Sequence, residues 1–555
     1  MKQTWWHGAV AYQVYPKSFM DSNGDGIGDL RGIISKLGYL HDLGVNLIWL
    51  SPAYPSPLAD EGYDVSDYYG IDPRFGTLAD MDELIAECDK HGMKVILDLV
   101  VNHCSDEHEW FQDVLMNHDS SPYRDYFYIV DKRTDGKLPT NWRSYFGGSV
   151  WEPLGDTGKL YLHVFHKKQP DLNWENPAVR EEVRKNIVWW LKRGVAGFRV
   201  DAITNIKKAL PFRDYPIDGL DGLSNIGNML ADANGIGAFL AELRDTAFKP
   251  HGAFTVGEVF NVGQEHLKEW VGADGYFSSM FDFNGAIFGG GSAWHSKQKI
   301  TAEDYKDCVF SAQEAANSSC ILSNIIENHD EPRGVNYYLP QGEITDAGKK
   351  MLAGLYFMLR GIPFIYQGQE LGMENTTIQT IGDVDDCASV NEYHIAREAG
   401  FSDEDAMTVV RCMSRDNART PMQWDGTENA GFTTGKPWLP INPNYKAINA
   451  AEQIADENSV LSFYKKLTAL RKSTEYGDTL VYGKVEPYLR EQKNLFAYKR
   501  EGVKTLLVAG NFQNEPQEMR LPSGTREFIL NNYDDAVVIG DTLRLASYQF
   551  VVIDL

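Results

Sequence analysis

Short apolar runs alternate with amphipathic stretches along most of the chain. The runs VNLIWLSP from Val45, KVILDLVVNH from Lys94 and VAGFRVDAI from Val195 are mostly apolar and rich in β-branched residues. The stretch VREEVRKNIVWWLKRG, from Val179, repeats its apolar residues with the period of an α-helix. Strands that are apolar on both faces and alternate with helices predict a parallel sheet covered by helices on both sides.

The same alternation continues toward the C-terminus. Further strands are predicted at AFTVGEVF from Ala253, CILSNIIENHD from Cys320 and GIPFIYQGQE from Gly361, with the helix KKMLAGLYFMLRG, from Lys349, between the last two. About eight such units, with polar residues directly after the strands, predict an α/β fold of the (β/α)8 TIM-barrel type. In that fold, catalytic groups lie at the C-terminal ends of the strands.

Three segments depart from this rhythm and predict the domain organisation. An aromatic, turn-rich segment follows the third strand, and a polar excursion, expected to be a partly helical flap, follows the eighth. Near the C-terminus the chain changes to short strands such as LVYGKV and FVVIDL, which are typical of an antiparallel β-sandwich domain. The expected parts are a barrel (1–103 and 177–476), an inserted lobe (104–176), a flap within the barrel (372–435) and a C-terminal β domain (477–555).

Composition narrows the range of partners. The 555 residues include 53 basic and 78 acidic ones, a formal net charge of −25, which repels nucleic acid and anionic membranes. The six cysteines form no CxxC pair, the N-terminus lacks the apolar core of a signal peptide, and no run of ~18 apolar residues predicts a membrane span. We therefore expect a cytoplasmic protein, monomeric or weakly homo-oligomeric, with no nucleic-acid or membrane partner.

Acidic residues close several of the predicted strands. Asp201 ends GFRVD, and Arg199 lies two positions earlier, on the same side of the strand. Glu258 ends FTVGE in apolar surroundings that should raise its pKa, and Asp330 follows His329 in ENHD. One Arg–Asp pair inside a barrel is more often a structural ion pair than a catalytic one. Several acids on one rim instead favour a catalytic site, because glycoside cleavage needs at least two carboxyl groups around the sugar.

The loop DSNGDGIGDL, residues 21–30, has the oxygen spacing of a cation-binding loop. Its EF-hand-like positions 1, 3, 5, 7 and 9 would be filled by four side chains and one carbonyl, from Asp21, Asn23, Asp25, Ile27 (carbonyl) and Asp29. Position 12, normally a glutamate, is Gly32, and the preceding AVAYQVYPKSF is typical of a strand rather than a helix. A structural cation therefore fits better than a calcium switch, and a metal-free turn is the alternative.

Several motifs together carry a family resemblance. DLVVNH (98–103), GFRVD (197–201), GEVF (257–260) and ENHD (327–330), in this order, resemble the four signature regions of glycoside hydrolase family 13, the α-amylase family. QPDLNWENP (169–177) resembles the fifth region and, with RDNARTPMQW (415–424), is similar to the oligo-1,6-glucosidase and α-glucosidase subfamily. The resemblance covers essentially the whole chain.

This resemblance implies roles for individual residues. Asp201 corresponds to the nucleophile, Glu258 to the acid/base and Asp330 to the third acid, which distorts the sugar. The residues that correspond to those holding the terminal glucose are Tyr63, Asp64, His103, Phe165, Arg199, His329 and Arg419. Arg415 lies one turn from Arg419 and is the alternative to it. The loop of residues 21–29 corresponds to the family's metal site, expected to hold a structural Ca²⁺, or Mg²⁺ in its place.

The implied activity is that of a retaining, exo-acting α-glucosidase on short α-1,4- or α-1,6-linked glucosides. In this subfamily, valine after the nucleophile accompanies α-1,6 cleavage and a smaller residue accompanies α-1,4 activity. Ala202 occupies that position, so we expect α-1,4 bonds to be accepted, with the full linkage range left open. Retention also predicts carboxyl groups about 5–5.5 Å apart.

Three other readings share parts of the pattern. Sucrose isomerases carry an arginine-rich loop after the fourth region, whereas this chain has EPRGVNYYLPQGE with Arg333 alone. Trehalose-6-phosphate hydrolases need a basic phosphate pocket, for which Lys207 and Lys208 are thin support. The non-catalytic heavy chains of amino-acid transporters require a membrane anchor and tolerate loss of the acids, and neither feature is found here.

Overall fold

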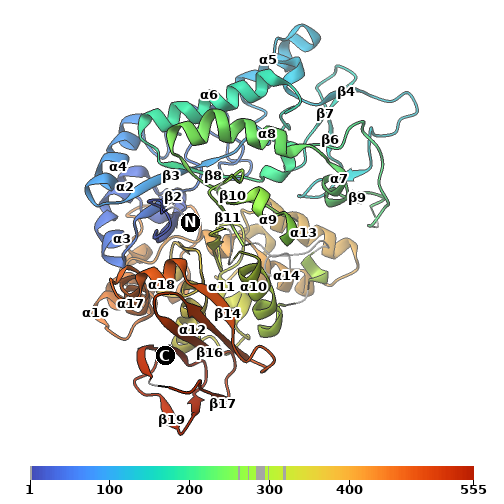
Figure 1. Cartoon of the computed structure of the whole chain (residues 1–555). Helices are drawn as coiled ribbons and strands as arrows, with labels where there is room; N and C mark the ends of the chain where they lie inside the picture. The colour runs from blue at the N-terminus through green and yellow to red at the C-terminus, as the bar shows by residue number, and fades with distance from the viewer. Residues whose placement is uncertain are drawn as a thin grey trace.

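The computed structural model describes residues 3–219, 221–260, 263–272, 274–282, 294–297, 299–316, 320–524 and 526–555. Its centre is a parallel eight-stranded sheet in the order β11-β10-β8-β3-β2-β1-β13-β12 (Figure 1). A parallel bridge from Phe281 to Ser323 joins the two ends, β11 and β12, and closes the barrel. The predicted TIM-barrel fold is therefore confirmed. The strands are β1 (Ala11–Val14), β2 (Leu47–Leu50), β3 (Lys94–Leu99), β8 (Gly197–Val200), β10 (Phe254–Gly257), β11 (Ser279–Met280), β12 (Ser323–Asn324) and β13 (Ile362–Tyr366).

Alternating side chains of these strands fill the barrel and pack beneath its helices. Trp49, Ile96, Phe254 and Phe364 belong to a buried cluster inside the sheet, while neighbouring residues join a larger cluster with the helices. This division follows from the two-residue period of a strand. The strands are shorter than the apolar runs that predicted them, so the polar residues after them fall in loops at the barrel rim.

Helix boundaries follow local capping chemistry. Helix α4 (Leu78–Lys90) begins with a capping box between Thr77 and Asp80, and α6 (Pro177–Arg193) ends at Gly194 in the left-handed conformation. Other helices around the barrel are α2 (Leu30–Ser35), α3 (Leu37–Leu43), α8 (Ile236–Leu243), α10 (Ala302–Ala316), α12 (Asp346–Phe357) and α17 (Val460–Lys472). The segment after β13 contains α13 (Cys387–Glu398), α14 (Asp403–Met413) and α15 (Asp416–Arg419).

The segment between β3 and α6 forms a lobe at the upper right of Figure 1. It contains a three-stranded antiparallel sheet in the order β4-β7-β6, formed by β4 (Ile129–Asp131), β6 (Trp151–Pro153) and β7 (Lys159–Leu162). Strand β5 (Trp142–Arg143) pairs in parallel with β9 (Ser224–Asn225), which follows β8. Backbone pairing therefore joins the lobe to the segment after β8.

Two antiparallel sheets form the C-terminal domain. One has the order β14-β15-β16-β21-β18 and the other β17-β20-β19, and buried residues of both form one cluster. The predicted strand at LVYGKV is wrong in its first half, because α18 (Gly477–Tyr482) occupies it and β14 starts at Lys484. The strands are β14 (Lys484–Pro487), β15 (Leu495–Glu501), β16 (Thr505–Asn511), β17 (Gln517–Arg520), β18 (Glu527–Asn531), β19 (Val537–Ile539), β20 (Thr542–Leu545) and β21 (Phe550–Asp554).

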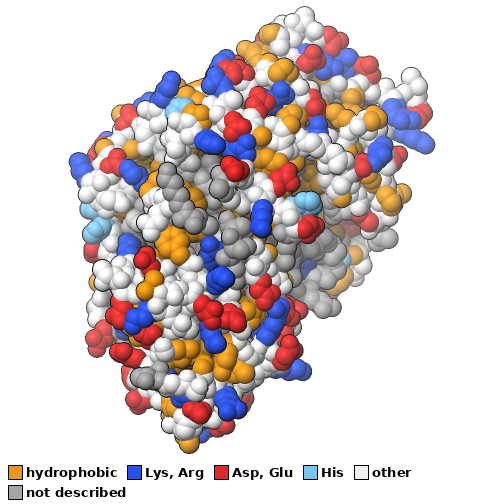
Figure 2. Space-filling view, viewed as in Figure 1, with side chains coloured by type: hydrophobic (Ala, Val, Ile, Leu, Met, Phe, Trp, Pro, Cys, Tyr) orange, Lys and Arg blue, Asp and Glu red, His pale blue; other side chains and the backbone are white. Residues whose placement is uncertain are grey.

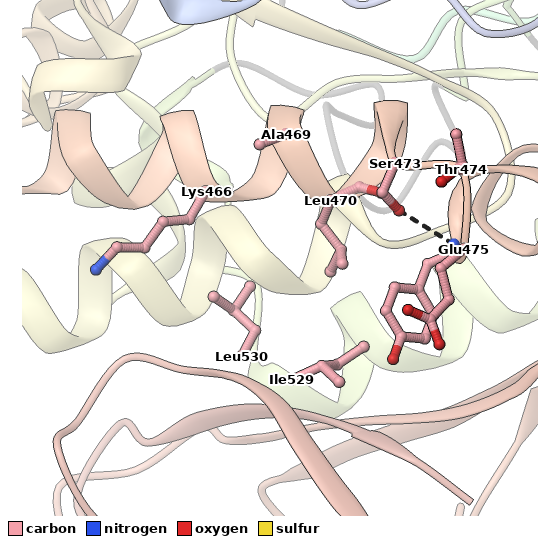
Figure 3. A pocket seen from close by; sticks show the side chains of 9 residues that line it. Lys466, Ala469, Leu470, Ser473, Thr474, Glu475, Ile529 and Leu530 are labelled. Carbon is pink, nitrogen blue, oxygen red and sulfur yellow. Dashed lines mark hydrogen bonds between the residues drawn. The ribbon is translucent and has the colours of Figure 1, made fainter.

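A groove of about 490 Å³ lies where this domain meets the barrel (Figure 3). It is lined by α17 and the segment after it on one side, and by Ile529 and Leu530 of β18 on the other. None of the predicted site residues lines it. Acidic and basic side chains intermingle over the face shown in Figure 2. None of the helices within the described ranges combines the length and apolar character that a membrane crossing requires.

Candidate active site

A single buried guanidinium organises the acids at the rim. Arg199 of β8 donates through Nη1 to Asp201 Oδ1 at 2.5 Å and to Asp98 Oδ1 at 2.7 Å, and its Nη2 lies 2.6 Å from Glu258 Oε1. Asp201 follows β8, Glu258 follows β10, and Asp98 lies on β3. The parallel register places Asp98 beside Arg199, and the neighbouring strands bring the other two acids to the same end. The predicted nucleophile and acid/base therefore meet at one cation.

Burial controls the protonation of these acids. It raises the pKa of the Asp201 carboxyl well above its usual range, with Arg199 opposing the shift and Glu258 adding to it. Burial also raises the pKa of Glu258, and the charge of Asp330 adds to that shift. Since one cation faces three carboxyl groups, we expect Asp201 and Glu258 to share one proton near neutral pH. Such a pair provides one carboxylate and one carboxylic acid.

The backbone directly after Asp201 contacts Glu258. Ala202 has φ 39° and ψ 35°, a left-handed conformation that is uncommon for residues other than glycine. This turn directs the Ala202 N–H to Glu258 Oε2 at 2.8 Å. One oxygen of Glu258 therefore faces Arg199 while the other accepts a backbone hydrogen bond. β-Branched residues are strongly disfavoured in this conformation, a constraint at position 202 that is separate from the space available for substrate.

Two guanidinium groups and an imidazole surround Asp330. Asp330 Oδ2 lies 3.0 Å from His329 Nε2, and its Oδ1 accepts from Arg419 at 3.0 Å and from Arg415 at 3.2 Å. Against the effect of burial, these three side chains hold the pKa of Asp330 well below its usual range. These contacts therefore favour the carboxylate form of Asp330, which can accept from sugar hydroxyls.

A stacked pair connects the two groups of acids. The ring of Tyr63 lies 5.2 Å from that of His329 at 11°, and its hydroxyl donates to Asp98 Oδ2 at 2.9 Å. Gln13 Nε2 lies 2.8 Å from His329 Nδ1, while His329 Nε2 lies 2.5 Å from the Tyr63 hydroxyl and 3.0 Å from Asp330 Oδ2. Nearby, the ring of His103 lies 5.2 Å from that of Phe165. Tyr63 and His329 therefore contact acids of the cluster, and His103 and Phe165 contact each other.

The sequence interpretation missed Asp60, a carboxylate in the loop before Tyr63. Asp64 is fully buried, and it accepts from Ser56 Oγ at 2.9 Å and from the N–H groups of Ala59 and Asp60 at 2.8 and 3.1 Å. Asp60, in contrast, accepts from Arg415 at 3.2 Å. The geometry thus favours Asp60 over the predicted Asp64 as the sugar-binding carboxylate. Asp60 can be recognised only from its contacts in the structure, because the segment DEGYD (60–64) contains three acids and no pattern that distinguishes them.

Arg415 and Arg419, which the sequence offered as alternatives, both contact Asp330. Both guanidiniums reach Asp330, and Arg415 additionally bridges to Asp60 and to Asp386, the latter at 2.7 Å. Arg419 donates through Nε to the His329 carbonyl at 2.9 Å, and its buried Nη1 has no hydrogen-bond partner within the described residues. Both arginines therefore belong to the site, with Arg415 connecting the Asp60 loop to the segment after β13.

A buried lysine joins the lobe to the barrel. Lys208 Nζ lies 2.6 Å from Asp171 Oδ2, donates to Asn102 Oδ1 at 3.0 Å, and is almost completely buried. Asp171 lies in the QPDLN motif and Asn102 directly precedes His103. The lysine thus has a structural role in the described geometry, and the ion pair fixes the lobe beside the catalytic rim.

The predicted metal loop is folded by its own hydrogen bonds. Asp21 accepts from the N–H groups of Asn23, Gly24 and Gly26 at 2.9, 2.7 and 2.8 Å. Asp29 is the N-cap of helix α2, where its side chain accepts a hydrogen bond from Gly32 N at 2.7 Å. Across the described ranges, His, Cys, Asp and Glu side chains alone form no group of three suited to a metal. The predicted oxygen-only set of Asp21, Asn23, Asp25, the Ile27 carbonyl and Asp29 still suits Ca²⁺ chemically.

Comparison with known proteins agrees with this geometry. Residues 13–483 match the alpha-amylase catalytic-domain family, and the chain belongs to that family of glycoside hydrolases. It is 42% identical over 542 residues to the probable oligo-1,6-glucosidase 3 of Bacillus subtilis, with 96% of each chain covered. It is 39% identical over 562 residues to the trehalose-6-phosphate hydrolase of the same organism, with 99% of this chain and 98% of the relative covered.

Solved structures extend the comparison to the whole fold. The trehalose-6-phosphate hydrolase of Bacillus licheniformis superposes with a TM-score of 0.90 at 38% identity, and the trehalulose synthase of Pseudomonas mesoacidophila with 0.94 at 37% identity. In each comparison both chains are covered completely. The chain is therefore a glycosidase with the domain arrangement of these enzymes.

Proposed function

We propose that this enzyme is a retaining α-glucosidase that removes α-glucose from the non-reducing end of short α-glucosides. The observation that carries the proposal is the shared Arg199 guanidinium, which brings Asp201 and Glu258 to one point while Asp330 lies among His329, Arg415 and Arg419. The similarity to oligo-1,6-glucosidases supports the substrate class.

The two acids have complementary roles in this mechanism. Asp201 attacks C1 of the bound glucose, and Glu258 gives its proton to the departing oxygen, forming a β-glucosyl ester. Glu258, now a carboxylate, then takes a proton from water, which attacks C1 and releases α-glucose. Asp330 accepts from hydroxyls of the same glucose and strengthens these contacts as the ring flattens.

We infer that the exo mode of attack comes from Asp60 and Arg415. Arg415 bridges Asp60 and Asp330 at 3.2 Å each, which supports a pocket closed beyond the non-reducing end. A chain extending past the terminal glucose would have to displace this bridge. The proposed pocket therefore accepts one glucose and leaves the rest of the substrate on the side of Glu258.

The bond cleaved is tested by a panel of substrates. We expect maltose and isomaltose both to be hydrolysed, with kcat/KM values within about tenfold of each other, because alanine at position 202 leaves room at the leaving-group side. Sucrose, trehalose and trehalose-6-phosphate complete the panel, and proton NMR reports the anomer of the released glucose. Strict use of isomaltose, fastest turnover of trehalose-6-phosphate, or conversion of sucrose to an isomer would each contradict this assignment.

We also propose that the loop of residues 21–29 binds a structural Ca²⁺ through Asp21, Asn23, Asp25, the Ile27 carbonyl and Asp29. Saturating Ca²⁺ should raise the melting temperature of the metal-free protein by about 2–5 °C. Asp25→Asn keeps an acceptor for the Ile27 N–H but removes a ligand charge, so it should abolish most of the shift. Equal melting temperatures with Ca²⁺ and with chelator in the unmodified protein would show that the loop is a metal-free turn.

A further inference from the structure

A largely buried ion pair lies next to the carboxylate that closes the candidate site. Lys17 Nζ donates to Glu61 Oε2 at 2.7 Å, and the two side chains are each 10% exposed. The Tyr15 hydroxyl donates to the same oxygen at 3.2 Å. Glu61 directly follows Asp60, whose carboxylate accepts instead from Arg415. Two adjacent acids of one loop therefore bind different parts of the molecule, Asp60 the segment after β13 and Glu61 the segment after β1.

The cation of this pair also contacts an aromatic ring. Lys17 Nζ lies 3.6 Å from the centroid of the Trp438 ring, and an ammonium group over a tryptophan face is attracted to it most strongly where water is excluded. The Trp438 ring N–H donates to Ser18 Oγ at 3.0 Å, and its backbone N–H donates to the Gly26 carbonyl at 3.1 Å. The ion pair therefore connects three segments that are far apart in the sequence.

The backbone of the loop explains why such an anchor is needed. Leu58 and Glu61 have φ values of 61° and 50°, in the left-handed region that residues other than glycine rarely adopt. Such conformations persist only where the surrounding contacts fix them. Asp64 accepts from the Asp60 N–H at 3.1 Å, and the pair with Lys17 fixes the side chain of Glu61. Without that pair, Glu61 is free to relax and to move Asp60 with it.

We propose that Lys17 and Glu61 are positioning residues, whose ion pair holds the Asp60 loop in the conformation that binds the terminal glucose and so sets the affinity for that sugar. This inference rests on the proposed α-glucosidase function. Arg415 bridges Asp60 and Asp330, so a shift of the loop loosens the whole closed end of the pocket. Contacts with the terminal glucose exist before and during bond cleavage, and their loss should therefore raise KM more than it lowers kcat.

The experiment measures kcat and KM for maltose, isomaltose and α-glucosyl fluoride, together with inhibition by D-glucose. The variants are Glu61→Gln, Glu61→Gly, Lys17→Met, Lys17→Arg and the double variant that combines Lys17→Met with Glu61→Gln. Glu61→Gly removes the anchor without penalising the loop, because glycine adopts a positive φ at no steric cost. Lys504→Met is the matched control, because Lys504 of the C-terminal domain pairs with Asp554 at 2.8 Å and lies 5.5 Å from the centroid of the Tyr476 ring.

We expect Glu61→Gln, Glu61→Gly and Lys17→Met each to raise KM about tenfold for all three substrates, with kcat within about threefold of the unmodified enzyme. The inhibition constant of glucose should rise by a similar factor, because glucose binds the same end of the pocket. The double variant should be no worse than either single one, since the two side chains act as one pair. Lys17→Arg keeps the charge and the ring contact, so its KM should change less than about twofold. Lys504→Met should match the unmodified enzyme.

Three results would overturn the inference. Unchanged KM and glucose inhibition in both Glu61 variants would show that the pair does not hold the pocket. A fall in kcat with unchanged KM would show that it acts on the chemical step or on the fold. Effects on KM that multiply in the double variant would show that Lys17 and Glu61 act independently. Failure of the proposed function is distinguishable, because in that case the unmodified enzyme would hydrolyse neither the disaccharides nor the fluoride.

Discussion

Asp201→Asn is expected to lower kcat for every α-glucoside by about four orders of magnitude or more. The amide has the shape of the carboxylate but cannot form the glucosyl ester. Loss of the Asp201 carboxylate should not destabilise the fold. Because burial raises the pKa of Asp201 in the folded protein, ionisation of this side chain opposes folding near neutral pH, and the neutral amide removes that cost. We therefore expect an unchanged or slightly higher melting temperature.

This expectation is checked with initial rates on isomaltose and maltose, and with thermal unfolding of both proteins at pH 7. Azide should partly restore turnover of α-glucosyl fluoride by Asp201→Ala and give the β-glucosyl azide, since removal of the side chain leaves space for an external nucleophile on the face that Asp201 attacks. Asp131→Asn, at an exposed carboxylate of the lobe paired with Lys159, serves as the control with unchanged rates. Retention of more than about a hundredth of the activity would exclude Asp201 as the nucleophile.

Glu258→Gln is expected to slow the cleavage of substrates whose leaving group needs a proton far more than that of substrates whose leaving group does not. Hydrolysis of isomaltose should slow about 10³-fold, since the leaving alcohol departs without general acid assistance, whereas formation of the glucosyl ester from α-glucosyl fluoride needs little such help. Burial raises the pKa of Glu258, so the protonated acid persists to higher pH. In the unmodified enzyme, kcat/KM should fall on the alkaline side as this proton is lost, and the glutamine variant should lack that limb.

The measurement is a pair of pH–rate profiles for kcat/KM, together with product analysis in azide. In the variant, azide should react with the β-glucosyl ester from the opposite face and give α-glucosyl azide, the reverse of the outcome for Asp201→Ala. An alkaline limb that survives in Glu258→Gln would assign the proton donor to another group. Equal losses for the fluoride and the disaccharide would argue for a role in folding or binding.

Much of the barrel follows from local sequence, because most strands coincide with apolar runs. β11 is the informative exception. It comprises only Ser279 and Met280, pairs with β10 through two residues, and reaches β12 by a single bridge. A strand this short has no periodicity to detect, and its existence depends on closure of the sheet around it. The α18 helix at Gly477–Tyr482 is a similar case, where packing against neighbours decides between two local conformations.

The site was predictable to the extent that its residues end strands. Asp201, Glu258 and Arg199 share one ion-pair cluster because parallel strands bring their C-terminal ends together. Asp60 was not predictable, because its position depends on a loop with positive φ angles at Leu58 and Glu61. Neither position is a glycine that would indicate a positive φ, and the hydrogen bonds that Asp64 accepts from this loop are seen only in the three-dimensional structure.

The pairing of β5 with β9, and the buried contact between Lys208 and Asp171, have a kinetic consequence. Swinging the lobe away from the barrel as a rigid body would break backbone pairing and expose a charged pair in one motion. Diffusion of sugar in and out should therefore proceed past side chains that rotate in place, without a large hinge opening of the lobe. Added viscosity should therefore lower the turnover rate by no more than it slows the diffusion of substrate and product.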